Sequence, residues 1–135
     1  MSDATWLVVG LGNPGSSYAA TRHNVGRLVV ELLAERAGAS FKAHRRGRAD
    51  VLETRLGDRP GVRTVLARPR SYMNESGGSV AALRDFFKID IDHLALIHDE
   101  LDIPFGTLRV KQGGGDNGHN GVRSVRAAMG TGEFC

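Results

Sequence analysis

Two residues have the chemical types needed to activate a water molecule: a histidine at position 23 and an aspartate at position 99. His23 lies just before a helical pattern, and Asp99 follows the short apolar run LALIH. A carboxylate that holds a neutral imidazole, with no serine or cysteine singled out beside it, is typical of a base that takes a proton from water. A histidine before a helix also serves as a purely structural hydrogen-bonding group, and this alternative stays open.

Three asparagines complete the candidate site. Asn13, Asn74 and Asn120 are each expected in a loop or a first helical turn, next to the end of a strand. Because open α/β sheets bind ligands at the carboxyl ends of their strands, one crevice can collect these amides together with His23 and Asp99. The amides would hold a carbonyl and peptide groups. The pattern favours hydrolysis of an activated acyl bond. An ester is favoured over an amide, because an alkoxide-type leaving group departs with less assistance from a general acid.

A metal site is the alternative interpretation of the acidic segment around Asp99. Glu100 and Asp102 lie close to it in sequence, and His98 and His119 are possible imidazole ligands. The spacings match no closed zinc pattern. We therefore expect no metal.

Two glycine-rich segments have the composition of phosphate-binding loops. GLGNPG at 10–15 formally matches G-x-G-x-x-G after a strand, the pattern of dinucleotide-binding folds. Pro14 removes one N–H donor and no amphipathic helix follows at once, so a tight turn at the strand exit is favoured and no dinucleotide cofactor is expected. The run of Gly113, Gly114 and Gly115 can form a backbone nest for a phosphate, or a mobile rim.

The elements that must position these residues alternate between strand and helix patterns, which is typical of a layered α/β domain. The expected strands are 6–10, 49–56, 61–67, 94–98 and 107–111, with a hairpin turn at 57–61, and the expected helices are 24–37, 72–87 and 118–129. The apolar positions with helical spacing are Leu28, Val29, Leu32 and Leu33 in the first helix and Val80, Leu83, Phe86 and Phe87 in the second.

Two local features do not fit this outline on their own. Residues 41–48 (FKAHRRGR) form a basic patch, expected as a loop or the start of a strand. Gly77 and Gly78 interrupt the second helix, which is unfavourable unless another element packs very close there.

Length and composition exclude several classes of protein. The chain has 135 residues, 41% hydrophobic and 24% charged, and no linker, so one domain over residues 1–135 is expected. There is no apolar stretch long enough to span a bilayer and no signal-peptide pattern, and the single cysteine, Cys135, fits a reducing cytosol. We expect a cytoplasmic protein without a membrane partner. A net charge of +3 permits a polyanionic partner without establishing one.

Three separated motifs, in order along the chain, make the sequence resemble bacterial peptidyl-tRNA hydrolases of the single-domain kind. They are VVGLGNPGSSYAATRHNVG at 8–26, RPRSYMNESGGSV at 68–80 and HDELDIPFGTLRVKQGGGDNGHNGVRSV at 98–125. The resemblance implies a single three-layer α/β/α domain with a mixed, largely parallel sheet. It also implies cleavage of the ester between a peptide and the 3′-terminal ribose of tRNA, with peptidyl-tRNA as partner and with neither metal nor organic cofactor.

The resemblance also assigns a role to individual residues. His23 would be the general base and Asp99 the group that orients it. The remaining roles are substrate binding by Asn13, Tyr18, Asn74 and Asn120, contact with the tRNA phosphate backbone by Arg109 and Lys111, and a flexible loop over the crevice formed by residues 113–118.

The sequence departs from the family pattern at its C-terminus, because family members typically continue with a further basic strand and C-terminal helices. We expect the chain to lack that last strand and those helices, and to be weakened in stability, in tRNA affinity or in both. A non-catalytic RNA-binding module on the same fold, or an inactive truncated product, therefore remains the alternative to a monomeric, active hydrolase.

Overall fold

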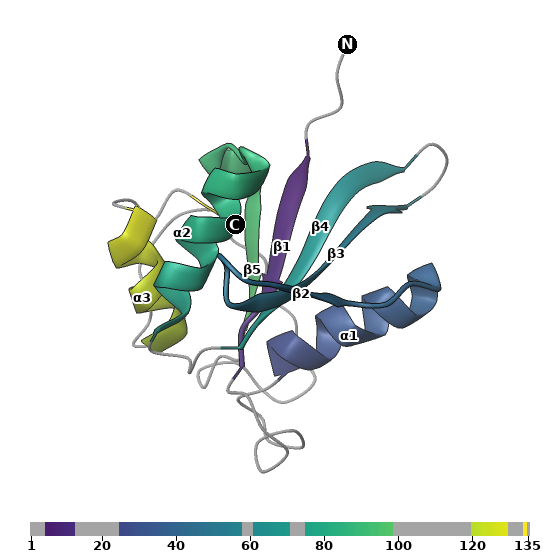
Figure 1. Cartoon of the computed structure of the whole chain (residues 1–135), viewed down its shortest axis with the longest axis horizontal. Helices are drawn as coiled ribbons and strands as arrows, with labels where there is room; N and C mark the ends of the chain where they lie inside the picture. The colour runs from purple at the N-terminus through teal and green to yellow at the C-terminus, as the bar shows by residue number, and fades with distance from the viewer. Residues whose placement is uncertain are drawn as a thin grey trace.

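Figure 1 shows a computed structural model of the chain, in which residues 5–12, 25–57, 61–70, 75–98, 120–129 and 134 are described. Its strands are β1 (Trp6–Gly10), β2 (Lys42–His44), β3 (Ala49–Leu56), β4 (Val62–Pro69) and β5 (Leu94–Ile97). Its helices are α1 (Val25–Ala37), α2 (Ser76–Phe87) and α3 (Asn120–Met129), and a short 3-10 helix, η4 (Ile91–His93), precedes β5.

The described strands form one mixed sheet in the order β2-β3-β4-β1-β5. Strand β1 lies in the middle and pairs in parallel with β4 on one side and β5 on the other. Strands β2, β3 and β4 are antiparallel neighbours, so β3 alone runs against the other four. The expected mixed sheet is therefore confirmed, with two parallel and two antiparallel pairings among the described strands.

Alternate residues of the central strands point to opposite faces of the sheet and form two apolar layers. On one face, Leu7 and Val9 of β1 join a cluster with Val80 of α2 and Val125 of α3. On the other face, Val8 packs against a smaller cluster that contains Ala34 of α1. Figure 1 shows the same arrangement, with α1 on one side of the sheet and α2 and α3 on the other. The three-layer α/β/α architecture follows.

The buried stripe of α1 differs from the one that its leucines suggest. Gly26, Val30 and Ala34 face the sheet, whereas Leu28 and Leu32 remain 46% and 50% exposed. Gly26, in the first turn of α1, allows a close approach to the sheet, and this contact fixes the rotation of the helix about its axis. The helix was predicted correctly, but these two leucines lie outside the core.

Several element boundaries also differ from expectation. Helix α2 begins at Ser76 rather than at residue 72, β4 extends to Pro69, and the basic patch contributes the short strand β2. Phe86 of α2, one of the apolar positions at helical spacing, is 47% exposed and lies outside the core. The expected strand 107–111 lies outside the described residues. Within the described part of the chain, none of the helices has both the length and the apolar character needed to cross a bilayer.

Candidate active site

The carboxyl ends of β1, β4 and β5 lie at one edge of the sheet, because these strands run parallel and adjacent. Helix α1, which follows β1, covers one face of the sheet, whereas α2, which follows β4, covers the other face. In open α/β sheets, ligands bind beyond the carboxyl ends of neighbouring strands whose connections leave toward opposite faces. Strands β1 and β4 are such neighbours, so this edge is the candidate site.

Backbone contacts hold the first motif against the end of β5, the residue before the third motif. A Cβ atom added to Gly10, the last residue of β1, would overlap the carbonyl oxygen of Gly26 in α1. A Cβ added to Gly26 would in turn overlap the carbonyl oxygen of Ile97 at the end of β5. The N–H of Leu11 donates a hydrogen bond of 2.9 Å to that same carbonyl. The exit of β1, the start of α1 and the exit of β5 are therefore packed against one another.

Helices α2 and α3 make a comparable contact near their first turns. A Cβ on Gly77 would overlap the backbone carbonyl of Ser124, and the Gly77 N–H donates a hydrogen bond of 2.8 Å to Ser124 Oγ. The sequence predicted that glycine inside this helix requires another element to pack very close to it, and at Gly77 the backbone of α3 does so. The second motif and the end of the third are thus joined across the α2–α3 contact.

The residues that the sequence assigned to the site fall almost entirely outside the described part of the chain. Those outside it are Asn13, Tyr18, His23, Asn74, Asp99, Arg109, Lys111, Gly113, Gly114 and Gly115. Asn120 is described as the first residue of α3. His23 precedes the start of α1 by two residues, and Asp99 follows the end of β5 by two. The pairing of the two side chains stays a prediction, while the elements that flank them are in contact.

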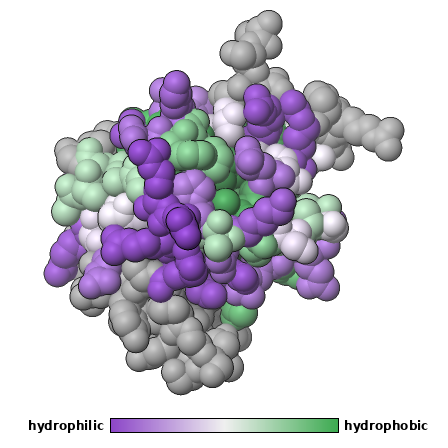
Figure 2. All heavy atoms as spheres, viewed as in Figure 1, coloured by the Kyte–Doolittle hydropathy of each residue, from purple (hydrophilic) through white to green (hydrophobic). Residues whose placement is uncertain are grey.

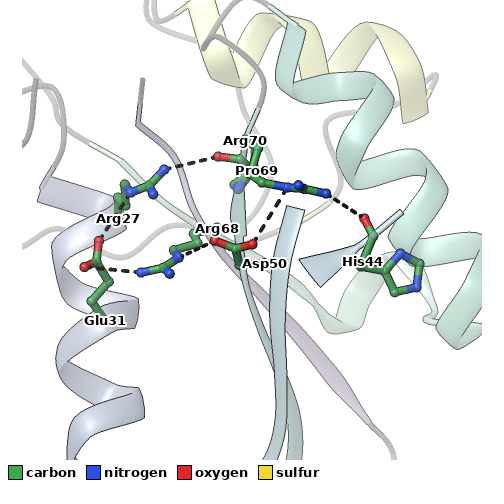
Figure 3. A network of polar contacts seen from close by, with 7 residues as sticks. All are labelled: Arg27, Glu31, His44, Asp50, Arg68, Pro69 and Arg70. Atoms are coloured by element: carbon green, nitrogen blue, oxygen red, sulfur yellow. Dashed lines mark hydrogen bonds and ion pairs between the residues drawn. The ribbon is translucent and has the colours of Figure 1, made fainter. Parts of the chain in front are cut away.

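A network of charged side chains fixes the end of β4 (Figure 3). Glu31 of α1 lies 3.3 Å from the guanidinium of Arg27 and 3.4 Å from that of Arg68. Asp50 of β3 lies 3.0 Å from the Arg68 guanidinium and 3.7 Å from that of Arg70. The two acids therefore share three arginines from α1, β4 and the residue that follows β4.

The same network reaches the backbone and an aromatic ring. Arg27 donates a hydrogen bond of 3.3 Å to the carbonyl oxygen of Pro69, the last residue of β4. The Arg68 guanidinium lies 4.3 Å from the centre of the Phe41 ring. These contacts hold the point at which the chain leaves β4 for residues 71–74 against the start of α1. They position the chain on either side of the candidate site and do not themselves supply a base or a nucleophile.

Sequence inspection missed this network, although two signals for it were present. Arg27 and Glu31 stand four residues apart on a helix, a spacing at which opposite charges meet. Asp50 and Arg68 stand directly opposite one another once the hairpin register is known. The first signal is readable from the spacing in the predicted helix, whereas the second requires the register of the hairpin.

A second polar cluster lies at the opposite edge of the sheet. Asp90, Asp92 and His93 hold their potential ligand atoms within 4.8 Å of one another, and His93 Nδ1 lies 3.0 Å from Asp92. Both aspartates are exposed, and the cluster precedes the amino end of β5. It is therefore separate from the candidate active site.

The fold and the position of the motifs define an α/β protein with its functional loops at the carboxyl edge of a mixed sheet. The family model for peptidyl-tRNA hydrolase matches residues 7–135. Peptidyl-tRNA hydrolases of Frankia casuarinae and Frankia alni are each 61% identical over 132 residues, covering 98% of this chain. A crystal structure of peptidyl-tRNA hydrolase from Acinetobacter baumannii matches 98% of this chain with a TM-score of 0.88 at 39% identity.

The chain belongs to the peptidyl-tRNA hydrolase family. It spans 65% of the length of the two Frankia proteins and 67% of the Acinetobacter chain. The resemblance on which the sequence interpretation depended is confirmed, together with the fold that it implied.

Proposed function

We propose that this chain hydrolyses the ester bond of peptidyl-tRNA and releases a free peptide and a free tRNA. The observation that supports this proposal most directly is the backbone packing of Gly26 between Gly10 and Ile97. This contact joins the elements that flank His23 and Asp99, the two residues whose chemistry the reaction needs. Membership of the family supplies the reaction and the class of substrate.

In the proposed mechanism, the neutral imidazole of His23 takes a proton from a water molecule. The resulting hydroxide attacks the carbonyl carbon of the ester and forms a tetrahedral intermediate. When this intermediate collapses, the carbon–oxygen bond to the ribose breaks and the leaving 3′ oxygen takes a proton, so that a carboxylic acid and tRNA are released. Asp99 orients the imidazole and stabilises its protonated form.

The amide side chains bind the peptide portion of the substrate in this proposal. Asn13 and Asn74 belong to segments that leave β1 and β4, and Asn120 begins α3. Amides are suited to this task because they donate and accept hydrogen bonds with peptide groups whatever the side-chain sequence. Tyr18 contacts the tRNA terminus, and the reaction uses no metal and no organic cofactor.

In this proposal the protein holds the body of the tRNA through contacts with its sugar-phosphate backbone, which do not depend on base sequence. Arg109 and Lys111 bind its phosphates, and residues 113–118 cover the crevice. Phosphate contacts carry no sequence information, which suits an enzyme that accepts every tRNA. All these residues come from one chain, so the site needs no second copy, and we propose that the protein acts as a monomer. We also propose that it acts in the cytoplasm, where its substrate is made.

The proposal is tested with an N-blocked aminoacyl-tRNA. The chain should release the blocked amino acid, and His23→Ala should abolish release while leaving tRNA binding and the melting temperature unchanged. Single-turnover assays separate this result from the RNA-binding alternative. Binding of the substrate by the unaltered chain without any release of product would contradict the proposed function.

A further inference from the structure

The turn between β2 and β3 carries an unusual density of positive charge. Residues 42–48 include one lysine and three arginines and no acid. We call residues 45–48 the arginine turn; the side chains of Arg45, Arg46 and Arg48 are exposed. Within the described part of the chain, none of the three forms an ion pair. Their charges are therefore available to a ligand in solution.

The arginine turn has a fixed backbone despite its exposure. The N–H of Gly47 donates a hydrogen bond of 3.0 Å to His44 Nδ1, and the hydroxyl of Ser79 in α2 donates one to the Gly47 carbonyl. The N–H of Arg70 donates a hydrogen bond of 2.8 Å to the carbonyl of Arg48. These bonds attach the turn to α2 and to the end of β4, so little backbone entropy is lost when a ligand binds it.

The turn lies on the same edge as the candidate active site. Ala49 pairs with Pro69, so residues 45–48 sit beside the carboxyl end of β4. The Arg48 guanidinium approaches Gly78, in the first turn of α2. The turn therefore lies beside Pro69 and Arg70, where β4 ends at the candidate edge of the sheet.

An exposed aromatic ring extends this surface along α2. His44 packs edge-on against Phe86 at 4.5 Å between ring centres, and the Arg46 guanidinium lies 6.0 Å from the same ring. Phe86 remains 47% exposed. Gly78 and Phe86 are eight residues apart in α2, so the surface extends for about 12 Å along this helix. In Figure 2, hydrophilic side chains cover this part of the molecule beside more apolar atoms.

The acids nearby do not cancel this charge. Asp50 is engaged by Arg68 and Arg70 in the network at the end of β4. Glu75, just before α2, and Asp85, within it, form no ion pair with the arginine turn in the described part of the chain. Lys88, just after α2, adds a further positive charge next to Asp85. A surface of this kind, with several free cations beside a partly exposed aromatic ring, suits a polyanion with flat apolar groups.

We propose that the arginine turn is a second tRNA-binding surface, at which Arg45, Arg46 and Arg48 bind phosphates of the substrate at a distance from the ester. This inference rests on the proposed function for the identity of the RNA. It adds a surface on β2, β3 and α2 to the contacts expected from Arg109 and Lys111. If the ester lies at the carboxyl edge and the acceptor arm of the tRNA runs along α2, phosphates of that arm lie next to the arginine turn.

The test compares two double variants with the unaltered chain. Arg45→Gln combined with Arg46→Gln removes two charges from the turn, and the control, Arg36→Gln combined with Arg63→Gln, removes two exposed charges at the opposite edge of the sheet. Each protein is assayed on N-blocked aminoacyl-tRNA and on the same ester carried by a CCA trinucleotide, which lacks the acceptor arm whose phosphates the turn is proposed to bind. Melting temperatures confirm that all variants fold.

We expect the turn variant to lose about tenfold in kcat/KM on the full tRNA and nothing on the trinucleotide. The slope of log affinity against log salt concentration should fall by about two, one for each phosphate contact. The control variant should retain both values within about twofold. An equal loss in both variants, or a loss on the trinucleotide, would overturn the proposal.

A failure of the proposed function gives a different result. If the unaltered chain hydrolyses neither ester, binding of uncharged tRNA is measured by fluorescence anisotropy with the same variants. Weaker binding and a smaller salt slope for the turn variant alone would still support the arginine turn as an RNA-binding surface. Equal binding by the turn variant, the control and the unaltered chain would overturn it.

Discussion

Gly26 of α1 lies directly against the carbonyl group of Ile97 at the end of β5, with no room for a side chain between them. The contact joins two segments that are 71 residues apart in sequence. It lies close in sequence to both residues of the proposed catalytic pair, because His23 precedes α1 and Asp99 follows β5. Small changes at Gly26 should therefore affect both the stability of the fold and the activity.

Gly26→Ala should lower the free energy of unfolding by about 1–3 kcal/mol, because the added methyl group must displace backbone rather than a flexible side chain. The measurement is chemical denaturation followed by circular dichroism. Activity at a temperature where the variant is still folded should also fall, since the flanking elements are pushed apart. Glu35→Ala, on an exposed position of the same helix, is the control and should change neither quantity.

Gly77 and Gly78 provide a matched pair within one helix. Gly77→Ala places a methyl group against the backbone of Ser124 and should destabilise the protein by about 1–3 kcal/mol. Gly78→Ala meets only the end of the Arg48 side chain, which can move, and should stabilise the helix by about 0.5–1 kcal/mol. Opposite shifts in melting temperature for the two variants would support the observed α2–α3 contact. Equal shifts would contradict it.

Most of the fold could be predicted because local signals agreed with the tertiary structure. The apolar run of β1, the turn cluster between β3 and β4, and the periodicity of α1 each specified an element at nearly the observed bounds. The exposure of Leu28 and Leu32 could not be predicted, because it depends on how Gly26 seats α1 on the sheet. Helical spacing identifies a helix but does not fix its rotation when two adjacent faces are apolar.

The candidate site was predicted less completely. The order of strands and loops predicted that the candidate residues follow the carboxyl ends of strands. The described ends of β1, β4 and β5 lie at one edge of the sheet, as this prediction requires. The network around Asp50 required the register of β3 against β4, which a sequence does not state. Phe86 shares a helical spacing with Leu83, but its ring is partly exposed and contacts His44 and Arg46, which the spacing alone does not predict.

Asp50→Asn should destabilise the protein by about 1–2 kcal/mol, because the carboxylate accepts a hydrogen bond of 3.0 Å from Arg68 and faces Arg70. The side chains of Asp50 and Arg68 are only 21% and 24% exposed, so solvent screens their contact incompletely. Glu53→Gln, at an exposed position of the same strand, is the control and should change stability by less than about 0.5 kcal/mol. Equal stability losses in the two variants would show that the network around Asp50 does not hold the end of β4.

Hydrolysis should depend on pH through the protonation state of His23. Only the neutral imidazole can take a proton from water, so the single-turnover rate should rise with pH as His23 loses its proton and then level off. Asp99→Asn should lower the plateau rate by roughly 100-fold or more, because an amide favours the wrong tautomer of the imidazole and cannot stabilise its charged form. Substrate affinity and melting temperature should stay unchanged in that variant. A rate that is independent of pH in the unaltered chain, or an Asp99→Asn variant with full activity, would exclude this pair as the source of the base.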